Sequence, residues 1–581
     1  MILIFGGTTE GRIAINVCEQ AGKPFYYSTK SNLQQVDMKN GIRLVGAMTS
    51  EDICRFCKEN DIKCIVDAAH PFAENLHKAI MNTDMPVVRF DRQRQEKIEG
   101  AVYCKSFEEA AEIMKQHDIK LLLALSGVNT IAKLKSYWQT HNTVFRILNR
   151  QESIETAKAS GLPADHIIFY DESLCLPTEQ QEIQLMKSIG CDAIITKESG
   201  QSGGFDQKIN AAKRLGIKIF IVEPPSTANT QHSTLDSRLS IITGPHSLRR
   251  AIEKAVPDFF PLKTGLSTGA CATAATKAAL LSVLTGDCPK EVVFALPDGE
   301  SITIPVEVES EGIASVVKDF SDDPDVTRGC KITAKVELNE SSEIRFMRGE
   351  GVGTVTLPGL GIPVGGPAIN ATPREMMTNE VRALTDQGCD ITISVENGSE
   401  IAKNTFNEKV GVRGGISIIG TTGIVSPLSN KAFVESIGRE LQVARAIGCT
   451  AIGLASGKNG EDALRTMFPD LRVVHYGNFI GETLKKAYAL GFEEVHLGIM
   501  IGKAVKLAEG NLDTHSHKVQ MNKQFLKSLA PEYADKIDNI TMARELWQFM
   551  PPAFFDKIQQ LCLSHCRTVF PQGELQIHLI K

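Results

Sequence analysis

The sequence lacks several features that mark specialised classes of protein. No apolar run reaches the roughly 18 residues of a membrane-spanning helix, and no basic segment precedes the first apolar run, so we expect neither a membrane span nor a signal peptide. Lys and Arg (63) do not outnumber Asp and Glu (69), and the net charge of −6 argues against a general nucleic-acid binder. The 14 cysteines follow no disulfide-framework spacing and predict reduced thiols in a cytoplasmic protein.

The length of 581 residues predicts about three to five folding units. Residues 1–252 alternate short apolar runs, such as CIVDAAHPF and DAIITKESG, with segments of helical spacing. This rhythm predicts βαβ units and parallel sheets, which bind ligands at the carboxyl ends of their strands. The segment 253–262, with Pro257 and Pro261 around two phenylalanines, is expected to be a linker or a docking segment.

The second half begins with the alanine-rich stretch TGLSTGACATAATKAA, which predicts a helix with Ser267 or Thr268 as its N-cap. Residues 290–400 are rich in strand-like and glycine-rich segments and predict an α+β lobe. From about 413 the α/β rhythm returns, starting with GGISIIGTTGIV, and the tail from 511 has mostly helical spacing.

The opening stretch MILIFGGTTEGR predicts a strand, a glycine turn and a helix start. Glycine lets backbone amides approach a ligand, and a helix N-terminus favours a phosphate. The alternative is a tight strand–helix turn without a ligand. The turn consists of Gly6, Gly7, Thr8, Thr9 and Glu10.

The expected end of the second strand reads FYYSTKS, where a dinucleotide site usually has an acid for the ribose hydroxyls. Ser28 and Lys30 stand there instead of a carboxylate, which favours a 2′-phosphate and hence NADPH over NADH. An exposed polar turn is the alternative.

Two further loops of the first half have residues suited to anions. His70 precedes a proline at a strand end, where it either donates to a ligand or belongs to a capped turn. The stretch TKESGQSGGFDQK has two lysines around a glycine–serine loop, which fits an anion grip or a solvated loop. The candidate anion ligands in this stretch are Lys197, Ser199, Gly200 and Lys208.

These stretches together resemble the precorrin-6A reductases of corrin-ring biosynthesis, through GGTTEGR, AAHPFA and TKESG…AAKRLGI. The resemblance implies two Rossmann-like lobes, about 1–120 and 121–252, with the nicotinamide nucleotide and the substrate between them. We assign the nucleotide, NADPH or NADH, to the glycine turn, Ser28, Lys30 and His70. Lys197, Ser199, Gly200 and Lys208 are assigned to the substrate.

In the second half, the small residues at the start of the alanine-rich helix indicate either close helix packing or a carboxylate on free amides. The stretch GTTGIVSPLS looks like a second strand–glycine turn. Asp513, His515 and His517 in DTHSH alternate, as zinc ligands on one face of a strand would, but no second ligand cluster accompanies them and we predict no metal site.

This half resembles the cobalt-precorrin-5B C1-methyltransferases, which use S-adenosylmethionine, through TGLSTGACATAATKAA, GVGTVTLPGLGIPVGGPAIN, GTTGIVSPLS, NFIGE and THS. The resemblance implies an α+β lobe over about 263–412, a Rossmann-like lobe over 413–510 and a helical tail over 511–581. Where a glycine–histidine pair is expected before IGK, the chain has Ile499 and Met500. If that histidine helps catalysis, another residue must do so here, and His496 is the nearest candidate. The residues assigned to S-adenosylmethionine are Gly420, Thr421, Thr422, Gly423 and Asn478, and those assigned to substrate are Thr268, Gly269, Thr514 and His515.

The two resemblances predict a bifunctional enzyme that methylates cobalt-precorrin-5B at C1 and then reduces cobalt-precorrin-6A to cobalt-precorrin-6B. The expected partners are small cobalt corrinoids, with no nucleic acid and no membrane; no catalytic residue is assigned. The substrate's carboxylates need basic partners. The candidates are Arg89, Arg92, Arg94, Arg146, Arg150, Lys197, Lys208, Arg374 and Arg413. The rival interpretations are a tetrapyrrole carrier without activity, and an unrelated nucleotide-dependent oxidoreductase fused to a transferase.

Overall fold

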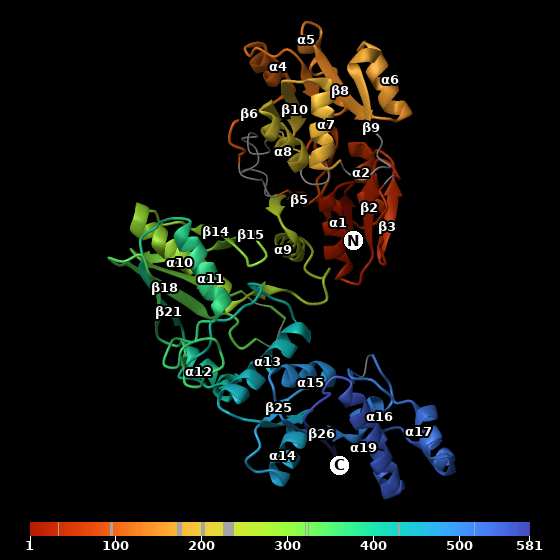
Figure 1. Cartoon of the computed structure of the whole chain (residues 1–581), viewed down its shortest axis with the longest axis vertical. Helices are drawn as coiled ribbons and strands as arrows, with labels where there is room; N and C mark the ends of the chain where they lie inside the picture. Colours follow the sequence, from red (N-terminus) through yellow and green to blue (C-terminus); the bar gives the residue numbers. More distant parts are fainter. Residues whose placement is uncertain are drawn as a thin grey trace. The chain divides into compact units, whose positions relative to one another are not determined.

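The chain forms two compact units, Met1–Pro261 and Leu262–Lys581. The computed structural model describes residues 1–32, 34–92, 97–170, 177–198, 204–224, 238–319, 321–322, 325–427, 430–515 and 518–581 (Figure 1). Within these ranges no helix is both long enough and apolar enough to span a membrane.

The first sheet of the first unit has six strands in the order β12-β5-β4-β1-β2-β3, and every neighbouring pair is parallel. This is the strand order of doubly wound nucleotide-binding sheets. Alternate residues of β1 point to opposite faces, where α1 and α9 cover one face and α2 and α3 the other. The bounds are β1 Ile2–Phe5, α1 Thr9–Glu19, β2 Phe25–Thr29, β3 Gly41–Val45, α2 Ser50–Glu59, β4 Cys64–Asp67, α3 Glu74–Met81, β5 Val87–Asp91, β12 Leu239–Thr243 and α9 Pro245–Ala255.

A second six-stranded parallel sheet has the order β6-β11-β10-β7-β8-β9. Helices α4, α5 and α6 pack on one face, and α7 and α8 on the other. The mixed α/β class with parallel sheets is thereby confirmed. The bounds are β6 Ala101–Cys104, α4 Phe107–Lys115, β7 Leu122–Ala124, α5 Lys135–Trp138, β8 Thr143–Leu148, α6 Gln151–Ala159, β9 Ile167–Tyr170, α7 Glu179–Ile189, β10 Ala193–Lys197, α8 Phe205–Leu215 and β11 Lys218–Val222.

The lobes of this unit differ from the expected division near residue 120. Strand β6 already belongs to the second sheet, and β12 with α9 returns to the first. The expected linker 253–262 is not a free connection either, because Phe259 and Phe260 are buried against the first sheet. Arg249 of α9 covers the Phe260 ring at 4.4 Å from its centroid. Apolar burial therefore ties this segment to the first unit, as the docking alternative held.

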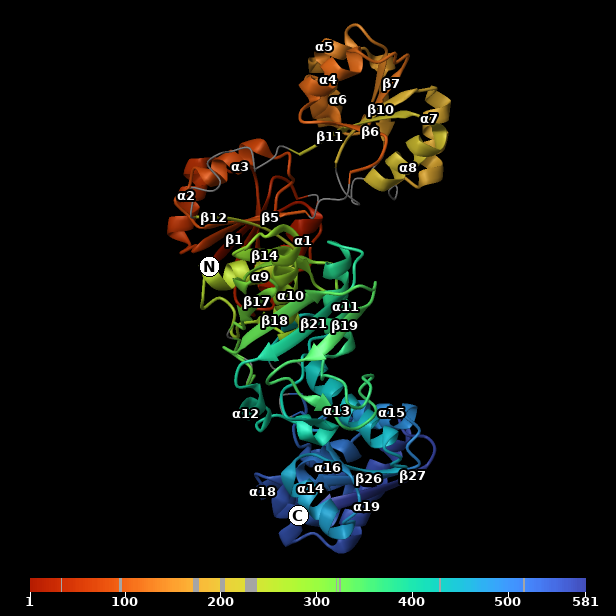
Figure 2. The ribbon, with the colours of Figure 1, turned by 90° about the vertical axis from the view of Figure 1, so that its left-hand side faces the viewer.

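The second unit opens with a lobe in which α10 and α11 pack on a five-stranded sheet of order β16-β17-β18-β21-β19 (Figure 2). Ser267 is the N-cap of α10, since its Oγ accepts a hydrogen bond from the Ala270 amide at 3.1 Å. The bounds are β13 Gly265–Leu266, α10 Thr268–Thr285, β14 Glu291–Ala295, β15 Ser301–Pro305, β16 Glu307–Ser310, β17 Ile313–Val317, β18 Lys331–Leu338, β19 Ile344–Arg348, β20 Thr354–Val355, α11 Ala371–Arg382, β21 Cys389–Val395, α12 Gly398–Ala402, β22 Val412–Arg413 and β23 Ile424–Val425.

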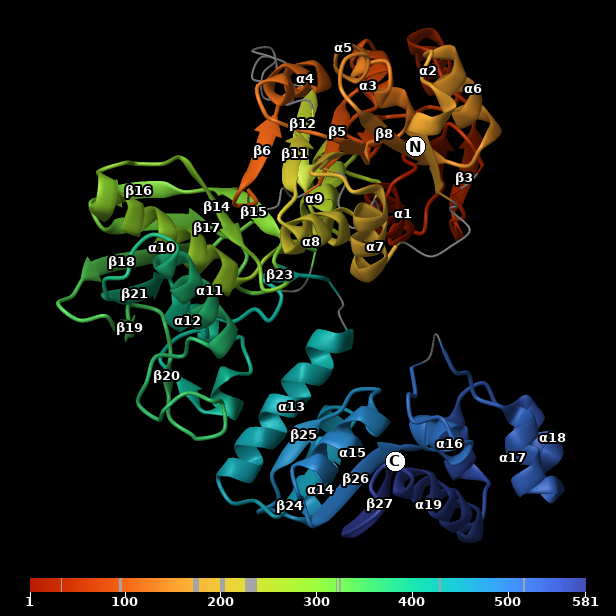
Figure 3. The ribbon, with the colours of Figure 1, turned by 45° about the horizontal axis from the view of Figure 1, so that its top comes forward.

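The last lobe is built on a four-stranded parallel sheet of order β25-β24-β26-β27 (Figure 3). Helices α13 and α15, then α16 and α19, contribute to its main core, and α14 packs on the opposite side. The bounds are α13 Asn430–Ala446, β24 Ala451–Ala455, α14 Lys458–Met467, β25 Val473–His475, α15 Ile480–Ala489, β26 Glu494–Met500, α16 Ile501–Ala508, α17 Lys523–Leu529, α18 Ala534–Asn539, α19 Pro552–Arg567 and β27 Glu574–Ile580.

Two expectations for this unit are wrong. The stretch 416–425 does not open the last lobe, because β23 pairs with β13 and Ile418 bridges to Ile369, so these residues complete the preceding lobe. The tail 511–581 is not only helical, since β27 pairs along β26 over seven residues and completes the sheet. In both cases a strand partner distant in sequence decides the placement.

Gly6 tests the packing of the first sheet. A Cβ at this position would lie 2.3 Å from the fully buried Tyr27 ring. Gly6→Ala should therefore lower the free energy of unfolding by about 1–3 kcal/mol. In the matched control Gly502→Ala, the new methyl would be 3.9 Å from Ala543, an ordinary contact. Urea unfolding of the full chain measures both, and an unchanged midpoint for Gly6→Ala would contradict this packing.

Candidate functional site

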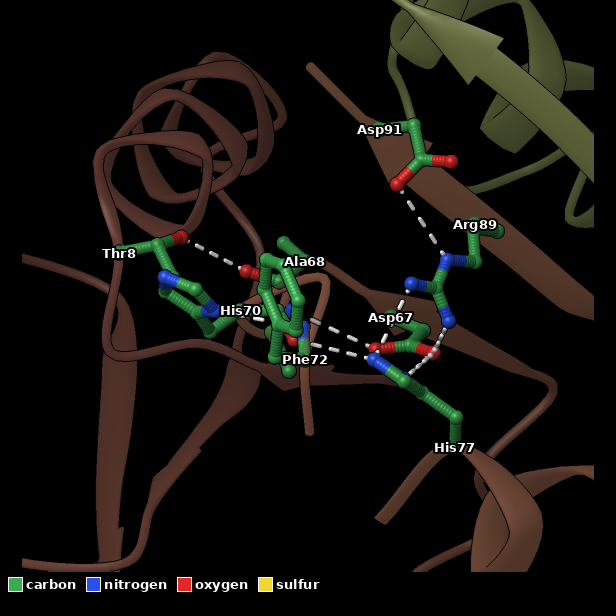
Figure 4. Close-up of polar contacts among 9 residues, drawn as sticks. Thr8, Asp67, Ala68, His70, Phe72, His77, Arg89 and Asp91 are labelled. Atoms are coloured by element: carbon green, nitrogen blue, oxygen red, sulfur yellow. Dashed lines mark hydrogen bonds and ion pairs between the residues drawn. The ribbon is translucent and has the colours of Figure 1, made fainter. Parts of the chain in front are cut away.

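The glycine turn after β1 is held by its own surroundings. The Gly6 amide donates to the Ser28 carbonyl at 3.0 Å, and the Gly7 amide donates to the Tyr27 hydroxyl at 2.9 Å. Thr8 is the N-cap of α1: its Oγ1 accepts from the Gly11 amide at 3.0 Å and donates to the Ala68 carbonyl at 2.8 Å (Figure 4). A phosphate here would therefore meet the first amides of α1, not those of the two glycines.

Glu10, in the first turn of α1, forms a two-pronged ion pair with Arg92, at 2.7 and 3.0 Å. Burial opposes ionisation of this carboxyl, but the Arg92 guanidinium and nearby donors hold its pKa below the usual value. The carboxylate stabilises both the helix N-terminus and Arg92. Its expected role toward the nucleotide stays a prediction.

At the end of β2, Ser28 and Thr29 are buried whereas Lys30 is exposed. A cation that the sequence motifs did not indicate lies here: Arg43 of the neighbouring strand β3 donates from Nη2 to Thr29 Oγ1 at 2.9 Å. Only strand pairing reveals it, because Tyr27 and Arg43 are register partners. In the sequence, only the alternation of apolar and polar residues in GIRLV could have indicated that Arg43 lies on a strand next to β2.

His70 follows β4 and faces the same edge. Its Nδ1 accepts from the Phe72 amide at 3.3 Å, which assigns the ring proton to Nε2. Burial, with Lys197 and Arg92 nearby, lowers the pKa of His70 to about 4. At neutral pH His70 is therefore uncharged, with Nε2–H as its donor, and its role toward a ligand stays a prediction.

Beside His70 lies a buried charge network centred on Asp67, the last residue of β4 (Figure 4). Asp67 Oδ2 is 2.7 Å from His77 Nδ1 and 3.1 Å from Arg89 Nη1. His77 Nε2 in turn lies 3.0 Å from the His70 carbonyl oxygen. The network thus fixes the loop that carries His70, and Arg89, expected to bind substrate carboxylates, is occupied by Asp67.

The two predicted lysines of the second lobe have different surroundings. Lys197 ends β10 and lies 5.2 Å from the Phe72 ring centroid, on the loop that carries His70. Burial lowers the pKa of both lysines, for Lys208 to about 8, where Arg146 also contributes and Glu182 opposes. Lys208 lies near the buried Arg146–Glu182 pair, whereas Lys197 lies at the loop that carries His70. Ser199, Gly200 and Arg94 lie outside the described residues.

In the second unit, GLSTG and GTTG meet although about 150 residues separate them. The Ser267 amide donates to the Gly423 carbonyl and the Gly269 amide to the Ile419 carbonyl, both at 2.9 Å. Thr268 Oγ1 accepts from the Ile419 amide at 2.9 Å. A Cβ at Gly420 would collide with Ser267 and one at Gly423 with Leu296, so packing within this corner requires both glycines. The corner contains Thr268, Gly269, Gly420, Thr421, Thr422 and Gly423.

Sequence reasoning missed the acidic loop beside this corner. The fully buried Lys318 pairs with Asp325 at 2.6 Å, and Asp319 accepts from the Leu266 amide at 2.7 Å. Ser321 Oγ is buried without a hydrogen-bond partner among the described residues. The run KDFSDDPD in the sequence was the available signal, because a buried lysine needs a carboxylate partner.

The carboxyl edge of the last sheet brings together residues from three segments. The Thr514 amide donates to the Asn478 carbonyl at 3.1 Å, and Lys503 Nζ donates to the Gly477 carbonyl at 2.5 Å. Thr514 is 1% exposed, yet its Oγ1 has no hydrogen-bond partner in the described structure. The residues assigned to S-adenosylmethionine are thus divided, with Asn478 here and Gly420 to Gly423 in the glycine corner.

Helix α13 connects these two places. Near its start, Glu435 accepts from Thr421 Oγ1 at 3.3 Å, while the Phe433 ring packs on Gly477 and Phe479. The glycine corner and the carboxyl edge of the last sheet therefore contact the same two helical turns.

The remaining histidine candidates lie elsewhere. Asp513 accepts from the His515 amide and from Lys518, and His517 lies outside the described residues. His496 is buried in the first half of β26, where it pairs with Glu494 at 2.8 Å and His578 at 3.1 Å. It is not at the carboxyl edge, so the structure does not support it as a substitute for the missing histidine.

Parallel sheets with glycine turns and buried polar groups at their carboxyl edges define a multidomain α/β protein of the class that binds ligands at these edges. The chain belongs to the cobalt-precorrin-5B C(1)-methyltransferase family. The relative from Prosthecochloris aestuarii is 41% identical over 345 residues, which cover 55% of this chain and 94% of the relative. The CbiD family matches residues 257–427, and the family Precorrin-6x reductase CbiJ/CobK matches residues 1–243.

Another cobalt-precorrin-5B C(1)-methyltransferase, from Geobacillus sp. (strain WCH70), is 38% identical over 323 residues, or 52% of this chain and 88% of the relative. A solved structure of CobK precorrin-6A reductase is 18% identical and covers 44% of this chain and 97% of its own, with a TM-score of 0.35. The chain is a bifunctional enzyme of cobalamin biosynthesis, with a reductase domain followed by a methyltransferase domain.

The contribution of the Asp67 network to the stability of the fold can be measured as a change in the free energy of unfolding. Asp67→Asn removes the charge that compensates the buried Arg89 and should cost about 3 kcal/mol of unfolding free energy. The control Glu112→Gln, in an exposed pair with Lys115, should stay within about 0.5 kcal/mol. Equal unfolding midpoints for the two variants would show that the network does not stabilise the fold.

Proposed function

We propose that the second unit transfers a methyl group from S-adenosylmethionine to C1 of cobalt-precorrin-5B, giving cobalt-precorrin-6A. The first unit then reduces this product to cobalt-precorrin-6B with NADPH. The observation that carries the proposal is the presence of the two families on one chain, because the product of the second unit is the substrate of the first. Residues 1–261 are proposed as the reductase and 262–581 as the methyltransferase, acting in the cytoplasm on free corrinoids.

The residues at the edge of the first sheet fit a nicotinamide nucleotide. The first amides of α1 would receive the phosphates, and the neutral His70 would donate a hydrogen bond from Nε2. When bound, the nicotinamide supplies the hydride that reduces the ring double bond. Lys197, held over Phe72 beside the His70 loop, would attract and orient a substrate carboxylate.

In the second unit, the buried Thr514 hydroxyl has no hydrogen-bond partner among the described residues, and this is the observation that fits a polar ligand. We infer that the carboxyl edge with Asn478, Lys503 and Thr514 holds S-adenosylmethionine, which supplies the methyl group when bound. This proposal moves Thr514, which the resemblance assigned to the substrate, to the methyl donor, and moves the GTTG turn from the methyl donor to the substrate. The glycine corner with Thr268 and Gly269 would then form the substrate side, next to α13. Catalysis would depend mainly on alignment of the two reacting carbons.

The methyl-donor site is tested by binding alone. Thr514→Val keeps the shape of the side chain and removes the hydroxyl, so the affinity for S-adenosylhomocysteine should fall about 5- to 30-fold, as for a lost buried hydrogen bond. Isothermal titration calorimetry measures it. The matched control Thr541→Val alters an exposed hydroxyl of the same unit and should leave the affinity unchanged. Undiminished binding by Thr514→Val would place the methyl donor elsewhere.

The order of the two reactions is tested with cobalt-precorrin-5B as the only tetrapyrrole. The full chain should oxidise NADPH only after S-adenosylmethionine is added, because the reducible intermediate forms by methylation. The absorbance of NADPH reports the reduction. Mass spectrometry of the product should show the added methyl group and the two added hydrogens. Oxidation without the methyl donor would refute this order.

A further inference from the structure

At the end of β2 lies a cationic side chain, Arg43, that belongs to the neighbouring strand β3. Tyr27 and Arg43 are register partners in the parallel pair β2–β3, so both side chains lie on the same face of the sheet. The Arg43 guanidinium carbon is 5.3 Å from the Tyr27 ring centroid, and Nη2 reaches Thr29 Oγ1, two residues further along β2. The guanidinium is thereby directed to the carboxyl edge, where the ribose of a dinucleotide lies in sheets of this order.

The Arg43 guanidinium has N–H donors that form no hydrogen bond within the described residues. Its Nε is buried and has no hydrogen-bond partner in the part of the chain that the structure describes. Within the same part, no carboxylate forms an ion pair with it, in contrast to Arg89 and Arg92. An unpaired guanidinium with a buried, unsatisfied N–H is costly, and a bound anion would relieve that cost.

Tyr27 connects this cation to the glycine turn. Its hydroxyl accepts from the Gly7 amide and donates to Gln34 Oε1 at 2.6 Å, and Gln34 Nε2 donates to the Thr8 carbonyl at 3.0 Å. Burial raises the pKa of Tyr27, and the hydrogen bond from the Gly7 amide and the charges of Arg43 and Arg12 oppose this rise. Tyr27 therefore links the Arg43 guanidinium to the turn at which the nucleotide's adenosine half would begin.

We propose that Arg43, not Lys30, is the residue that selects a nucleotide with a 2′-phosphate. Arg43 is held by Thr29 and Tyr27 and can meet a phosphate with its remaining donors, whereas Lys30 is exposed. The inference rests on the proposed reductase function, and it names the residue that decides between NADPH and NADH.

The test is the affinity of the full chain for two fragments, 2′,5′-ADP and ADP, measured by isothermal titration calorimetry without any turnover. The unaltered protein should bind 2′,5′-ADP at least about tenfold more tightly. Arg43→Gln should weaken 2′,5′-ADP binding about 10- to 100-fold and leave ADP binding nearly unchanged. Lys30→Gln and the remote control Arg55→Gln, whose arginine pairs with Asp52 on α2, should both keep the preference.

Retention of the preference by Arg43→Gln, or its loss in Lys30→Gln alone, would overturn the inference while the reductase proposal stands. If the unaltered chain bound neither fragment nor NADPH, the cofactor assignment itself would fall and this inference with it. Circular dichroism checks that Arg43→Gln is folded. If Arg43→Gln does not fold, the ratio of the affinities of the unaltered protein for 2′,5′-ADP and ADP is measured at increasing NaCl concentration. This ratio should decline as NaCl rises, and a ratio that does not change with salt would contradict an ionic origin of the preference.

Discussion

Close approach of a side chain to a glycine at a strand end is the constraint on which the candidate sites depend. Tyr27 occupies the place that a Cβ of Gly6 would need, Ser267 does so at Gly420, and Phe433 at Gly477. In each case a turn at an expected ligand site is packed against another segment of its own unit. These glycines therefore shape the sites first through packing, and any ligand meets the neighbouring amides and side chains.

The charged side chains near the sites are also positioned by contacts within their own unit. Buried cations are compensated inside the fold, as Arg89 is by Asp67 and Lys318 by Asp325, because an unpaired charge in the interior is costly. The cations that can serve ligands are those held by other means, such as Lys197 over Phe72 and Arg43 over Tyr27. The proposed substrate, with its many carboxylates, would thus meet a protein whose net charge is negative but whose strand ends carry such cations.

The fold was largely predictable where local pattern determines it. The apolar runs at β1, β4, β10 and β11, and the capped helix α10, follow directly from alternation and the N-cap serine. The placement of 416–425 could not be predicted, because an apolar run beside a glycine turn has the same pattern whichever sheet it joins. The same holds for β27, whose partner β26 lies about 80 residues earlier.

For the sites, the two families, the glycine turns and the residue types around them could be recognised from the sequence alone, because short motifs in a fixed order are local features. Which of these residues meet depends on the tertiary structure. It joined Thr268 to the residue before the GTTG turn, placed Lys208 near Arg146 and Glu182, and brought Arg43 to the end of β2. The reason is physical: strand register and burial place side chains from distant segments next to one another, and neither register nor burial partner is encoded in a local stretch of sequence.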